Sequence, residues 1–370
     1  MKVLFISNYR DFSGWGNAAY NKILSMQSAG IDLYIRPIYF SENKRQCELL
    51  DELEAKSSKK YDYIIQYTLP HYYSYNGPAI NIGNYECETT FKTSLWQKYI
   101  NMMDCAWVSS TSSLDQSLLS DVHTKVSIVP NSIDLDYYKN HQLEADIDGI
   151  DKDSYNFYYV GELSKRKNIS TLLRAFYCTF GPKENVNLIL KLNKPGYSSG
   201  EVFKKFQELD EKIRYGLKLG NKHRKVICLT DYLPMDNLTA IVKKFNCFIT
   251  TSYGEGWCIP AIEAVAMGQQ VVYPSQSSIK DFAPDKYSYP ISVDLSTCYD
   301  AVDTLGNLYT AKDYWKEPVF NSICRCMKMA VLDRGLISKN QIAQSVEKFS
   351  IENVGKAIKK ELENATKYRK

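Results

Sequence analysis

Residues 249–274 read ITTSYGEGWCIPAIEAVAMGQQVVYP, and this stretch decides the fold of the chain. It begins in an apolar run that is typical of a buried strand, and its small, turn-prone residues precede a helix that Pro260 opens and Gly268 ends. A second apolar run, at 271–273, predicts another strand. Strand, loop, helix and strand in this order make a βαβ unit, which belongs to a parallel sheet.

Two glutamates flank the start of this helix, Glu255 just before it and Glu263 one turn inside it. The backbone N–H groups near residues 257–260 and the helix dipole form an anion site that suits a phosphate. Because carboxylates repel a phosphate, we interpret them as hydroxyl acceptors on either side of a diphosphate, one for a sugar and one for a ribose. The alternative is that Glu263 only complements the helix dipole and Glu255 is a solvated loop charge.

The spacing of these glutamates, EGWCIPAIE followed by AVAMGQQVV, resembles the nucleotide-binding segment of the family-four retaining glycosyltransferases (glycosyl transferases group 1). These enzymes have the GT-B fold, in which two Rossmann-like α/β domains with parallel sheets face a central cleft. The resemblance implies that Glu255 contacts the transferred sugar and that Glu263 holds the ribose. It implies that four intervening amides hold the diphosphate: those of Gly256, Trp257, Cys258 and Ile259. Cys258 stands where the family usually has glycine, which keeps the amide and leaves less space.

The length and composition of the chain fit two ordinary globular domains. With 370 residues, the chain exceeds what one hydrophobic core usually organises. Its hydrophobic content of 44% and charged content of 24% are typical of globular proteins. The net charge of +4, from 46 basic and 42 acidic residues, is too small and dispersed to indicate a nucleic-acid partner. Nothing in the sequence indicates an oligomeric state.

The ten cysteines contain no CxxC pair and no nearby histidine with metal-ligand spacing. Several of them, such as Cys228 and Cys247, lie in apolar runs and are interpreted as buried, reduced thiols of a cytoplasmic protein. We therefore predict neither a metal nor a cofactor. The apolar run at the N-terminus is too short for a signal peptide, and no window approaches 18 apolar residues, so no membrane span is expected.

Apolar runs alternate with helical stretches along the first 145 residues, a pattern that predicts an open parallel sheet covered on both faces. Strands are expected at residues 3–7, 31–38, 63–66, 79–82, 106–108 and 126–129, and helices at 17–29, 45–56, 91–102 and 112–119. The turn at Pro130 and Asn131 is interpreted as structural. The polar stretch at 139–154 has no hydrophobic periodicity and is the expected interdomain linker.

The loop after the first strand contains Gly14 and Gly16 in a G-x-G-x-x-A pattern, which raises a dinucleotide-binding hypothesis. Two features oppose it: the first glycine comes well after the strand, and the second strand ends near Arg36 without the acidic residue that binds an adenosine ribose. The family resemblance implies instead that Gly14 and Gly16 face the donor phosphates and the acceptor. A plain turn is the alternative.

Two acidic residues, Glu86 and Glu88, follow the strand at 79–82, at the edge where α/β sheets bind ligands. Many members of the family have a histidine or aspartate near this point that touches the donor sugar. We prefer Glu88 for this role, with Glu86 as the other candidate. A solvated capping carboxylate is the competing interpretation.

The second domain opens with the segment GELSKRKN at 161–168, between a strand and a helix. An exposed basic run is usually a solvated face, but this loop and the loop at 254–260 are both expected at the carboxyl edge of one sheet. The family has an arginine just after the glycine and a lysine further on, both on the donor diphosphate. Lys167 matches the lysine, Glu162 takes the arginine position, and Arg166 is the expected replacement cation.

Further segments of the second domain follow the same alternation. Strands are expected at 156–160, 186–192, 226–229, 245–250 and 271–273, and helices at 169–180, 201–217 and 235–245. Lys191, at the end of a strand, is expected to point into the cleft. By resemblance, the turn at Tyr232 and Leu233 receives the nucleobase through backbone groups. The stripe of Phe203 and Phe206 on the helix at 201–217 predicts a core face, and its lysines permit peripheral contact with a membrane.

Residues 299–330 and 350–367 are expected to be helical, and the resemblance implies that the last helix crosses back onto the first domain. The predicted division is a Rossmann-like acceptor-side domain at 1–145, a Rossmann-like nucleotide-sugar domain at 146–345 and the crossing helix at 346–370.

We therefore predict a retaining, metal-independent hexosyltransferase that moves a sugar from GDP-mannose or a UDP-sugar to a glycan or lipid-linked acceptor. The predicted catalytic residues are Lys167, Arg166, Glu255 and Glu88. A nucleotide-sugar epimerase of the same fold is an alternative, although four histidines are few for acid–base chemistry. A non-catalytic sugar-nucleotide-binding relative is the other, given Glu162 in place of arginine.

Overall fold

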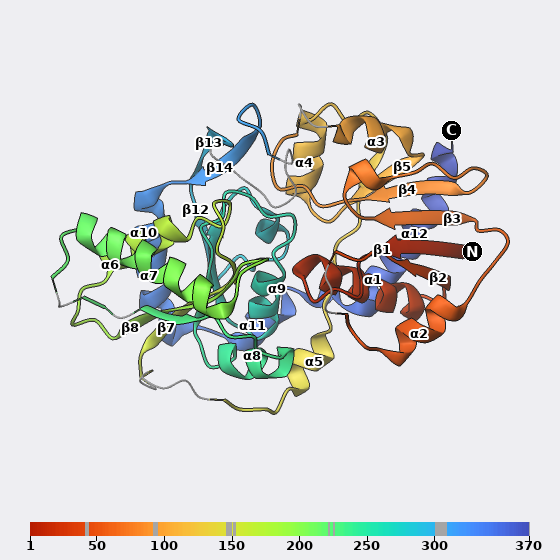
Figure 1. Ribbon diagram of the computed structural model, residues 1–370. Helices are drawn as coiled ribbons and strands as arrows, with labels where there is room; N and C mark the ends of the chain where they lie inside the picture. Colours follow the sequence, from red (N-terminus) through yellow and green to blue (C-terminus); the bar gives the residue numbers. More distant parts are fainter. Residues whose placement is uncertain are drawn as a thin grey trace.

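The computed structural model contains two six-stranded parallel sheets with helices on their faces, side by side (Figure 1). It describes residues 1–40, 44–91, 95–145, 150, 153–220, 223–224, 226–299 and 309–369.

The first sheet has the strand order β2-β1-β3-β4-β5-β6, all parallel. Its strands are β1 (Lys2–Ser7), β2 (Asp32–Pro37), β3 (Tyr63–Tyr67), β4 (Ile80–Asn84), β5 (Cys105–Val108) and β6 (Val126–Ile128). The helices between them are α1 (Gly14–Ser28), α2 (Glu48–Ala55), α3 (Trp96–Met102) and α4 (Thr111–Leu119). Each strand predicted for this half is confirmed within two residues, because strands buried on both faces form continuous apolar runs.

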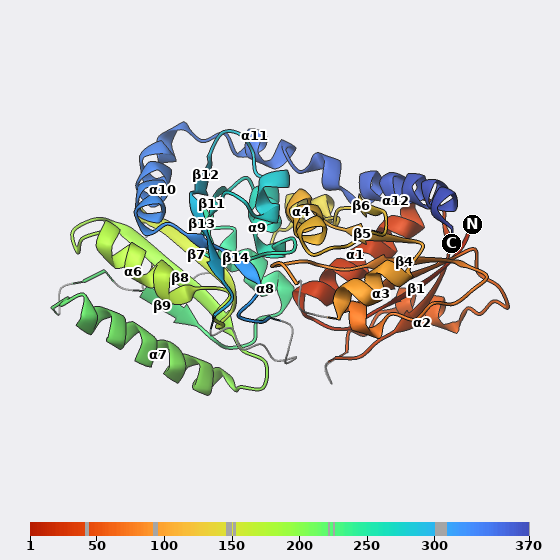
Figure 2. The same ribbon diagram turned by 90° about the horizontal axis from the view of Figure 1, so that it is seen from above.

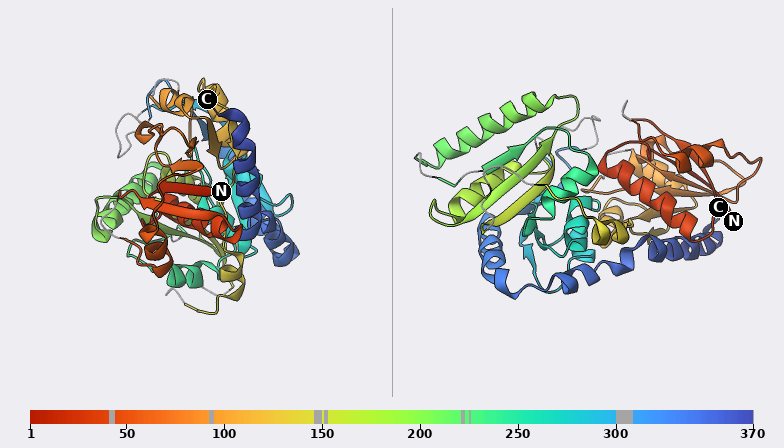
Figure 3. Two further views of the ribbon diagram at one scale, coloured as in Figure 1. Left: turned by 90° about the vertical axis from the view of Figure 1, so that its right-hand side faces the viewer. Right: turned by 90° about the horizontal axis from the view of Figure 1, so that it is seen from below.

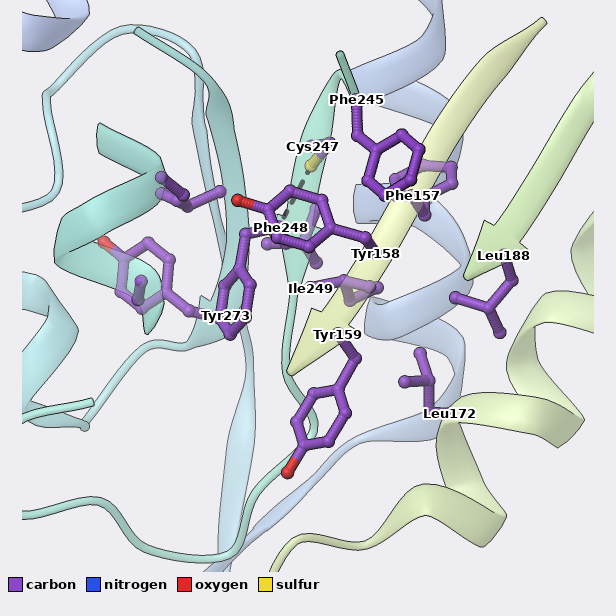
Figure 4. Close-up of a cluster of buried hydrophobic side chains, with 14 of the residues drawn as sticks. Phe157, Tyr158, Tyr159, Leu172, Leu188, Phe245, Cys247, Phe248, Ile249 and Tyr273 are labelled. Atoms are coloured by element: carbon purple, nitrogen blue, oxygen red, sulfur yellow. Dashed lines mark hydrogen bonds between the residues drawn. The ribbon is translucent and has the colours of Figure 1, made fainter. Parts of the chain in front are cut away.

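The second sheet has the order β12-β11-β10-β7-β8-β9. Its strands are β7 (Tyr155–Glu162), β8 (Val186–Asn193), β9 (Val226–Leu229), β10 (Cys247–Ile249), β11 (Gln270–Pro274) and β12 (Ser288–Ile291), and its helices include α6 (Ile169–Thr179), α7 (Ser199–Gly216), α8 (Met235–Val242) and α9 (Ile259–Ala266). Aromatic rings fill the core between β7 and β10, where the Tyr158 ring centroid lies 5.5 Å from those of Phe245 and Phe248 (Figure 4). The α/β fold with two parallel sheets is as predicted.

The prediction of one helix at 299–330 is wrong in part. Strands β13 (Val293–Thr297) and β14 (Tyr314–Pro318) form an antiparallel pair, and α10 (Phe320–Leu332) begins only after Pro318. Exposed Tyr314 is followed by Trp315, which is buried and stacks on Tyr253 with ring centroids 4.3 Å apart. This tertiary contact favours the extended backbone over the helix. Residues 300–308 of the predicted helix lie outside the described residues.

The last helix, α12 (Ile351–Ala365), crosses back onto the first domain as predicted. After α10 the chain passes through α11 (Lys339–Gln344), and α12 then lies along α1 (Figures 2 and 3). Val354, Ile358 and Leu362 join the core of the first sheet. A Cβ on Gly355 would stand 2.2 Å from the Ser25 carbonyl oxygen, so the two helices approach as closely as backbones allow.

The helix α7 covers the outer side of the second sheet (Figure 2). Val202, Phe206 and Ile213 are buried, whereas Phe203, which the sequence placed on the same face, is 40% exposed. Within the described ranges, none of the helices combines the length and the apolarity that crossing a bilayer requires.

Candidate active site

The loops after β7 and β10 lie next to each other, because these two strands are paired in the second sheet. The backbone N–H of Tyr253 donates to the Arg166 carbonyl over 2.8 Å. Asn168 Nδ2 donates to the Thr251 carbonyl over 3.1 Å, and Thr251 Oγ1 donates back to the Asn168 carbonyl over 3.0 Å. The two segments that carried the family resemblance are therefore joined at one sheet edge.

Glu255 is the centre of a buried ionic cluster. Its side chain is 5% exposed, and Lys167 Nζ lies 2.7 Å and 2.8 Å from its two carboxylate oxygens. Arg166 Nη1 lies 3.4 Å from Glu255 Oε2 and donates to the Gly254 carbonyl over 2.7 Å. Burial acts to raise the pKa of Glu255, but the two cations outweigh it and hold that pKa below its ordinary value. The carboxylate is therefore ionised at neutral pH.

Glu88 reaches the same cluster from the first domain. Its Oε2 atom lies 2.9 Å from Arg166 Nε, and the Tyr309 hydroxyl donates to the same oxygen. The four residues predicted to be catalytic thus meet at one place, although Glu88 and Glu255 are far apart in the sequence. Tyr309 was not foreseen, because it falls in the segment predicted to be helical.

The start of α9 offers free amide groups, as the sequence predicted. The helix begins at Ile259, so Pro260 takes its second position, and Gly268 ends it with a φ of +73°. Four backbone N–H groups at the start of α9 have no hydrogen-bond acceptor among the described residues. They belong to Gly256, Trp257, Cys258 and Ile259. These donors fit an anion at the helix start.

Cys258 has a left-handed backbone, with a φ of +69°. This conformation is unfavourable for residues with a Cβ atom and natural for glycine. The structure therefore explains why glycine is usual at this position in the family that the sequence resembles. Trp257, in contrast, contributes only its backbone, since its indole is buried with ring centroids 5.1 Å from Phe282 and 5.3 Å from Phe349.

Glu263 is partly buried one turn inside α9. The Tyr138 hydroxyl, from α5 (Leu135–Asn140), donates to Glu263 Oε1 over 2.7 Å. Burial raises the pKa of Glu263 to about 7, and the Tyr138 hydrogen bond opposes this only in part. The carboxyl therefore titrates near neutral pH. Nothing in the sequence marked Tyr138 as its partner. Tyr138 belongs to the core of the second sheet, upstream of the predicted boundary at 145.

Glu86, the candidate that the sequence ranked below Glu88, is held in a polar network. Tyr67 Oη donates to Glu86 Oε1 over 2.6 Å, and Asn131 Nδ2 donates to the same oxygen over 2.8 Å. Ser109 Oγ donates to the other carboxylate oxygen. Asn131 thus does more than shape the turn to which the sequence assigned it.

A buried lysine, Lys22 on α1, lies near this network. Its Nζ atom is 5.4 Å from the Tyr67 ring centroid and donates to the Val129 and Pro130 carbonyls over 3.2 Å and 3.3 Å. Burial lowers the pKa of Lys22 to about 8, and the charge of Glu86 opposes the shift. The sequence could not indicate this residue, since a single lysine on a helix is usually solvated.

The glycines Gly14 and Gly16 form the first turn of α1, not the loop that the sequence predicted. Ser13 Oγ caps this turn by accepting from the Gly16 N–H over 3.1 Å. A Cβ on Gly16 would lie 2.2 Å from the Asp11 carbonyl oxygen, whereas one on Gly14 would meet nothing within 4 Å. Gly16 is therefore required by packing inside the first domain. Contact of either glycine with a ligand stays a prediction.

Three predicted donor-binding residues are not part of the cluster. Lys191 lies on β8, where burial lowers its pKa and Cys228 and Asp231 oppose the shift. It makes no ion pair within the described residues. Tyr232 is 75% exposed in the turn between β9 and α8, next to the partly buried Leu233. Their roles in binding a nucleotide stay predictions.

The two domains touch directly beside the cluster. A Cβ on Gly254 would stand 1.8 Å from the Glu88 carbonyl oxygen, and one on Gly256 would stand 2.8 Å from the Glu86 Cβ atom. The Ser109 hydroxyl oxygen also lies 3.0 Å from the Gly256 carbonyl oxygen. The cavity lined by Glu88, Glu255 and Lys316 measures about 10 Å³, which is enough for about one water molecule. The structure is therefore a closed arrangement of the domains.

Metal-ligating side chains do not gather here. In the ranges that the structure covers, no three His, Cys, Asp or Glu side chains come close enough together to hold a metal ion.

Comparison with known proteins supports the predicted family. Residues 141–287 match the family model described as glycosyl transferases group 1. The match covers about two fifths of the chain. The glycosyltransferase motif segments at 161–168 and 254–268 both lie inside it. The chain is also 29% identical over 160 residues to an uncharacterized glycosyltransferase of Methanocaldococcus jannaschii. That match covers 42% of this chain and 36% of the relative, so the chain spans about a third of the relative's length.

Similar solved structures extend over the whole chain. The sucrose-phosphate synthase of Thermosynechococcus elongatus has a TM-score of 0.65 at 14% identity, with 99% of each chain covered. The catalytic domain of starch synthase IV from Arabidopsis thaliana has a TM-score of 0.66 at 11% identity, with 99% of each chain covered. At such low identity the likeness concerns the fold alone, and it agrees with the predicted GT-B fold.

Proposed function

We propose that this glycosyltransferase is a retaining, metal-independent enzyme that moves a hexose from a nucleoside-diphosphate sugar, GDP-mannose or a UDP-sugar, to a hydroxyl of a glycan or lipid-linked acceptor. The observation that carries the proposal is the buried Glu255 carboxylate, which Lys167 and Arg166 hold at the start of α9. This cluster lies inside the segment that matches the family model.

The charges of the cluster favour an exchange of partners on donor binding. Glu88 and Glu255 carry two negative charges, and Arg166 and Lys167 carry two positive charges. Because these charges already balance, a diphosphate gains most when it replaces Glu255 as the partner of Lys167. The released carboxylate is then free to accept a hydrogen bond from a hydroxyl of the transferred sugar, which is the role that the family resemblance implies.

The chemical step follows from the same groups. The bond between the sugar C1 and the diphosphate oxygen breaks, and C1 bonds to the acceptor oxygen on the same face. The acceptor proton passes to the leaving phosphate. Lys167, Arg166 and the free amides before α9 stabilise the negative charge that builds on the diphosphate, which is preorganised electrostatic catalysis. Contact between the domains excludes water and limits hydrolysis.

Two further observations support parts of this proposal. The similar starch synthase IV domain was solved bound to ADP and acarbose, which favours a nucleoside diphosphate as the leaving group here. All ten cysteines are free thiols, which favours a reducing compartment such as the cytoplasm. There the enzyme would be either free in solution or peripheral at a membrane surface.

A panel of nucleotide sugars tests the function. We expect one donor to raise the melting temperature in the presence of EDTA and to release its nucleoside diphosphate when an acceptor is added. The Glu255→Gln variant should keep its fold and lose transfer by roughly 10²-fold or more, because the hydrogen bond to the sugar weakens. Full transfer by this variant would contradict the proposed site. Donor binding without any release would favour a non-catalytic relative, and an altered sugar on an intact nucleotide would favour an epimerase.

A further inference from the structure

Exposed aromatic rings gather at the carboxyl edge of the first sheet. Phe12 follows β1, Tyr39 and Phe40 follow β2, and Tyr72 follows β3 in a short 3₁₀ turn. Between 45% and 53% of each side chain is exposed. These three strands are neighbours in the sheet, so we name the four residues the aromatic edge.

Each ring of the aromatic edge contacts another of its rings or a cation. The ring centroids of Phe40 and Tyr72 are 6.0 Å apart. Lys44 Nζ lies 3.9 Å from the Tyr39 ring centroid, and Arg45 Cζ lies 5.6 Å from that of Phe12. Large exposed rings in such a group are typical of a binding surface and not of a solvated face.

Arg45 is held in place by polar and aromatic contacts. Its guanidinium lies 4.3 Å from the Tyr20 ring centroid and donates to Asn17 Oδ1. The buried Arg45 Nε atom has no hydrogen-bond partner in the described part of the chain. Unpaired buried donors are rare in native proteins and call for an explanation, such as a ligand.

Two acidic residues of α2, Asp51 and Glu54, are paired with another arginine. Arg10 lies 2.6 Å from Asp51 and 2.8 Å from Glu54, and it also donates to the Arg45 carbonyl over 2.9 Å. Across the residues that the structure places, neither Lys44 nor Arg45 forms an ion pair. The aromatic edge therefore carries two cations that a ligand can neutralise.

We propose that the aromatic edge binds the acceptor, and that this acceptor is an oligosaccharide with an anionic group. Rings stack on the apolar faces of sugars, while Arg45 and Lys44 pair with a carboxylate or phosphate substituent. The inference rests on the proposed transfer reaction. The same sheet edge faces the second domain, since Glu88 after β4 and Ser109 after β5 contact it. A surface beside the interdomain contact suits a substrate better than a membrane.

The test uses the full chain and two probes of equal length, the anionic tetragalacturonate and the neutral maltotetraose, titrated by NMR at low salt. We expect tetragalacturonate to bind about fivefold more tightly. The double variant F40A/Y72A should weaken binding of both probes about tenfold, which corresponds to about 1.4 kcal/mol. The variant R45Q should abolish the preference for the anionic probe.

Two control variants match these changes elsewhere. Tyr215→Ala removes a ring that is 88% exposed on α7, and Lys56→Gln removes a cation that lies 4.6 Å from the Tyr34 ring centroid. Both should leave probe binding within about twofold of the parent. Equal binding by the parent and F40A/Y72A would overturn the inference. A second outcome would also overturn it: the parent binds neither oligosaccharide but adsorbs to phosphatidylglycerol vesicles, and F40A/Y72A no longer adsorbs.

The outcome is separable from that of the proposed function. The melting-temperature shift with nucleotide sugars is measured on the same variants. A retained donor shift in F40A/Y72A, with oligosaccharide binding lost, supports the aromatic edge as an acceptor site. A retained donor shift together with unchanged oligosaccharide binding overturns the aromatic edge and leaves the transferase intact. A parent that binds oligosaccharide and no donor would contradict the proposed function instead.

Discussion

The two sheets have the same parallel architecture but end in loops of different chemistry. The carboxyl edge of the second sheet holds buried charges, with Glu255 between Lys167 and Arg166. The carboxyl edge of the first sheet exposes rings, such as Phe12 and Tyr72, beside cations that form no ion pair with any residue the structure describes. A diphosphate requires fixed charges shielded from water, whereas a saccharide is bound by flat apolar faces and a few polar groups. The proposed donor and acceptor sites follow this difference.

Two carboxylates of the first domain connect these edges. Glu88 pairs with Arg166, and Glu86 lies against Gly256. In the proposed reaction the donor and the acceptor must meet, and this contact lies between their two proposed sites.

The largest effect is expected from a change in the buried charges at the carboxyl edge of the second sheet, which we call the charged edge. Lys167→Ala removes the closest partner of Glu255, and we expect transfer to fall by roughly 10²–10³-fold because the charge on the leaving diphosphate loses its stabilisation. Oligosaccharide binding at the aromatic edge should not change. Initial rates of nucleotide release and the NMR titration together check both statements.

Lys165→Ala is the matched control, since Lys165 lies in the same loop and is exposed. Its transfer rate should stay within about twofold of the parent. Equal losses in both variants would mean that the general charge of the loop matters, not the pairing with Glu255.

A second change separates the two edges without removing a functional group. Gly254→Ala places a Cβ 1.8 Å from the Glu88 carbonyl oxygen, so the domains must move apart. We expect transfer to fall by roughly 10²-fold through misplacement of the reacting groups. The radius of gyration from X-ray scattering should rise. Gly200→Ala, where an added Cβ meets nothing within 4 Å, is the control. An unchanged transfer rate in Gly254→Ala would mean that the closed contact is not needed for the reaction.

A third prediction sharpens the role of Glu263 through pH. Its pKa is raised to about 7, so the carboxyl is mostly protonated at pH 6 and mostly ionised at pH 8. Only the ionised form accepts hydrogen bonds with both oxygens, so donor affinity should rise up to about tenfold between these pH values. A nucleotide sugar is the right probe, because its diphosphate diester does not titrate there. Isothermal titration at the two pH values provides the measurement.

Glu263→Gln is the control for this dependence. The titratable groups near Glu263 are Tyr137, Tyr138 and Tyr158. Burial raises the pKa of Tyr137 to about 12 and holds the pKa values of Tyr138 and Tyr158 well above the ordinary tyrosine value, so none of the three titrates in this range. Donor affinity of the variant should be independent of pH. A raised folded-state pKa also means that stability is present below the unfolded value of 4.5 and is lost as pH rises through about 7. The unfolding free energy of Glu263→Gln should lack this decline, and a persistent pH dependence would exclude Glu263 as its source.

The sequence predicted the fold because buried parallel strands are visible as apolar runs, and because both charged loops had to end at one sheet edge. The sequence alone therefore predicts that Lys167 and Glu255 lie close together. Glu88 was within reach for the same reason, as a carboxylate after β4. These predictions depend on local pattern and sheet topology alone.

Partners set by tertiary contact could not be predicted. The strand β14 forms because Trp315 stacks on Tyr253, and neither residue marks the other in the sequence. The same holds for Tyr138, whose hydroxyl meets Glu263 only after α5 packs on α9. The preference for Glu88 over Glu86 also depended on position in the sequence alone. In the structure Glu88 pairs with Arg166, and Glu86 accepts hydrogen bonds from Tyr67 and Asn131.

The smallest expected effect concerns the backbone at the start of α9. The left-handed φ of +69° at Cys258 costs a residue with a Cβ about 1–2 kcal/mol, whereas glycine lowers stability by about 0.5–1 kcal/mol through the unfolded chain. We compare Cys258→Gly with Cys258→Ala, because both variants lack the thiol and differ only in the Cβ atom. The glycine variant should be more stable by about 0.5–1 kcal/mol in urea unfolding. In the interior of α9, where Ala264 has ordinary helical neighbours on both sides, Ala264→Gly should instead lose about 1 kcal/mol. If glycine in place of alanine raises the unfolding free energy at position 258 and lowers it at position 264, the amides at the start of α9 are held in a strained backbone. If both changes have the same sign, backbone strain does not explain the glycine that is usual in the family.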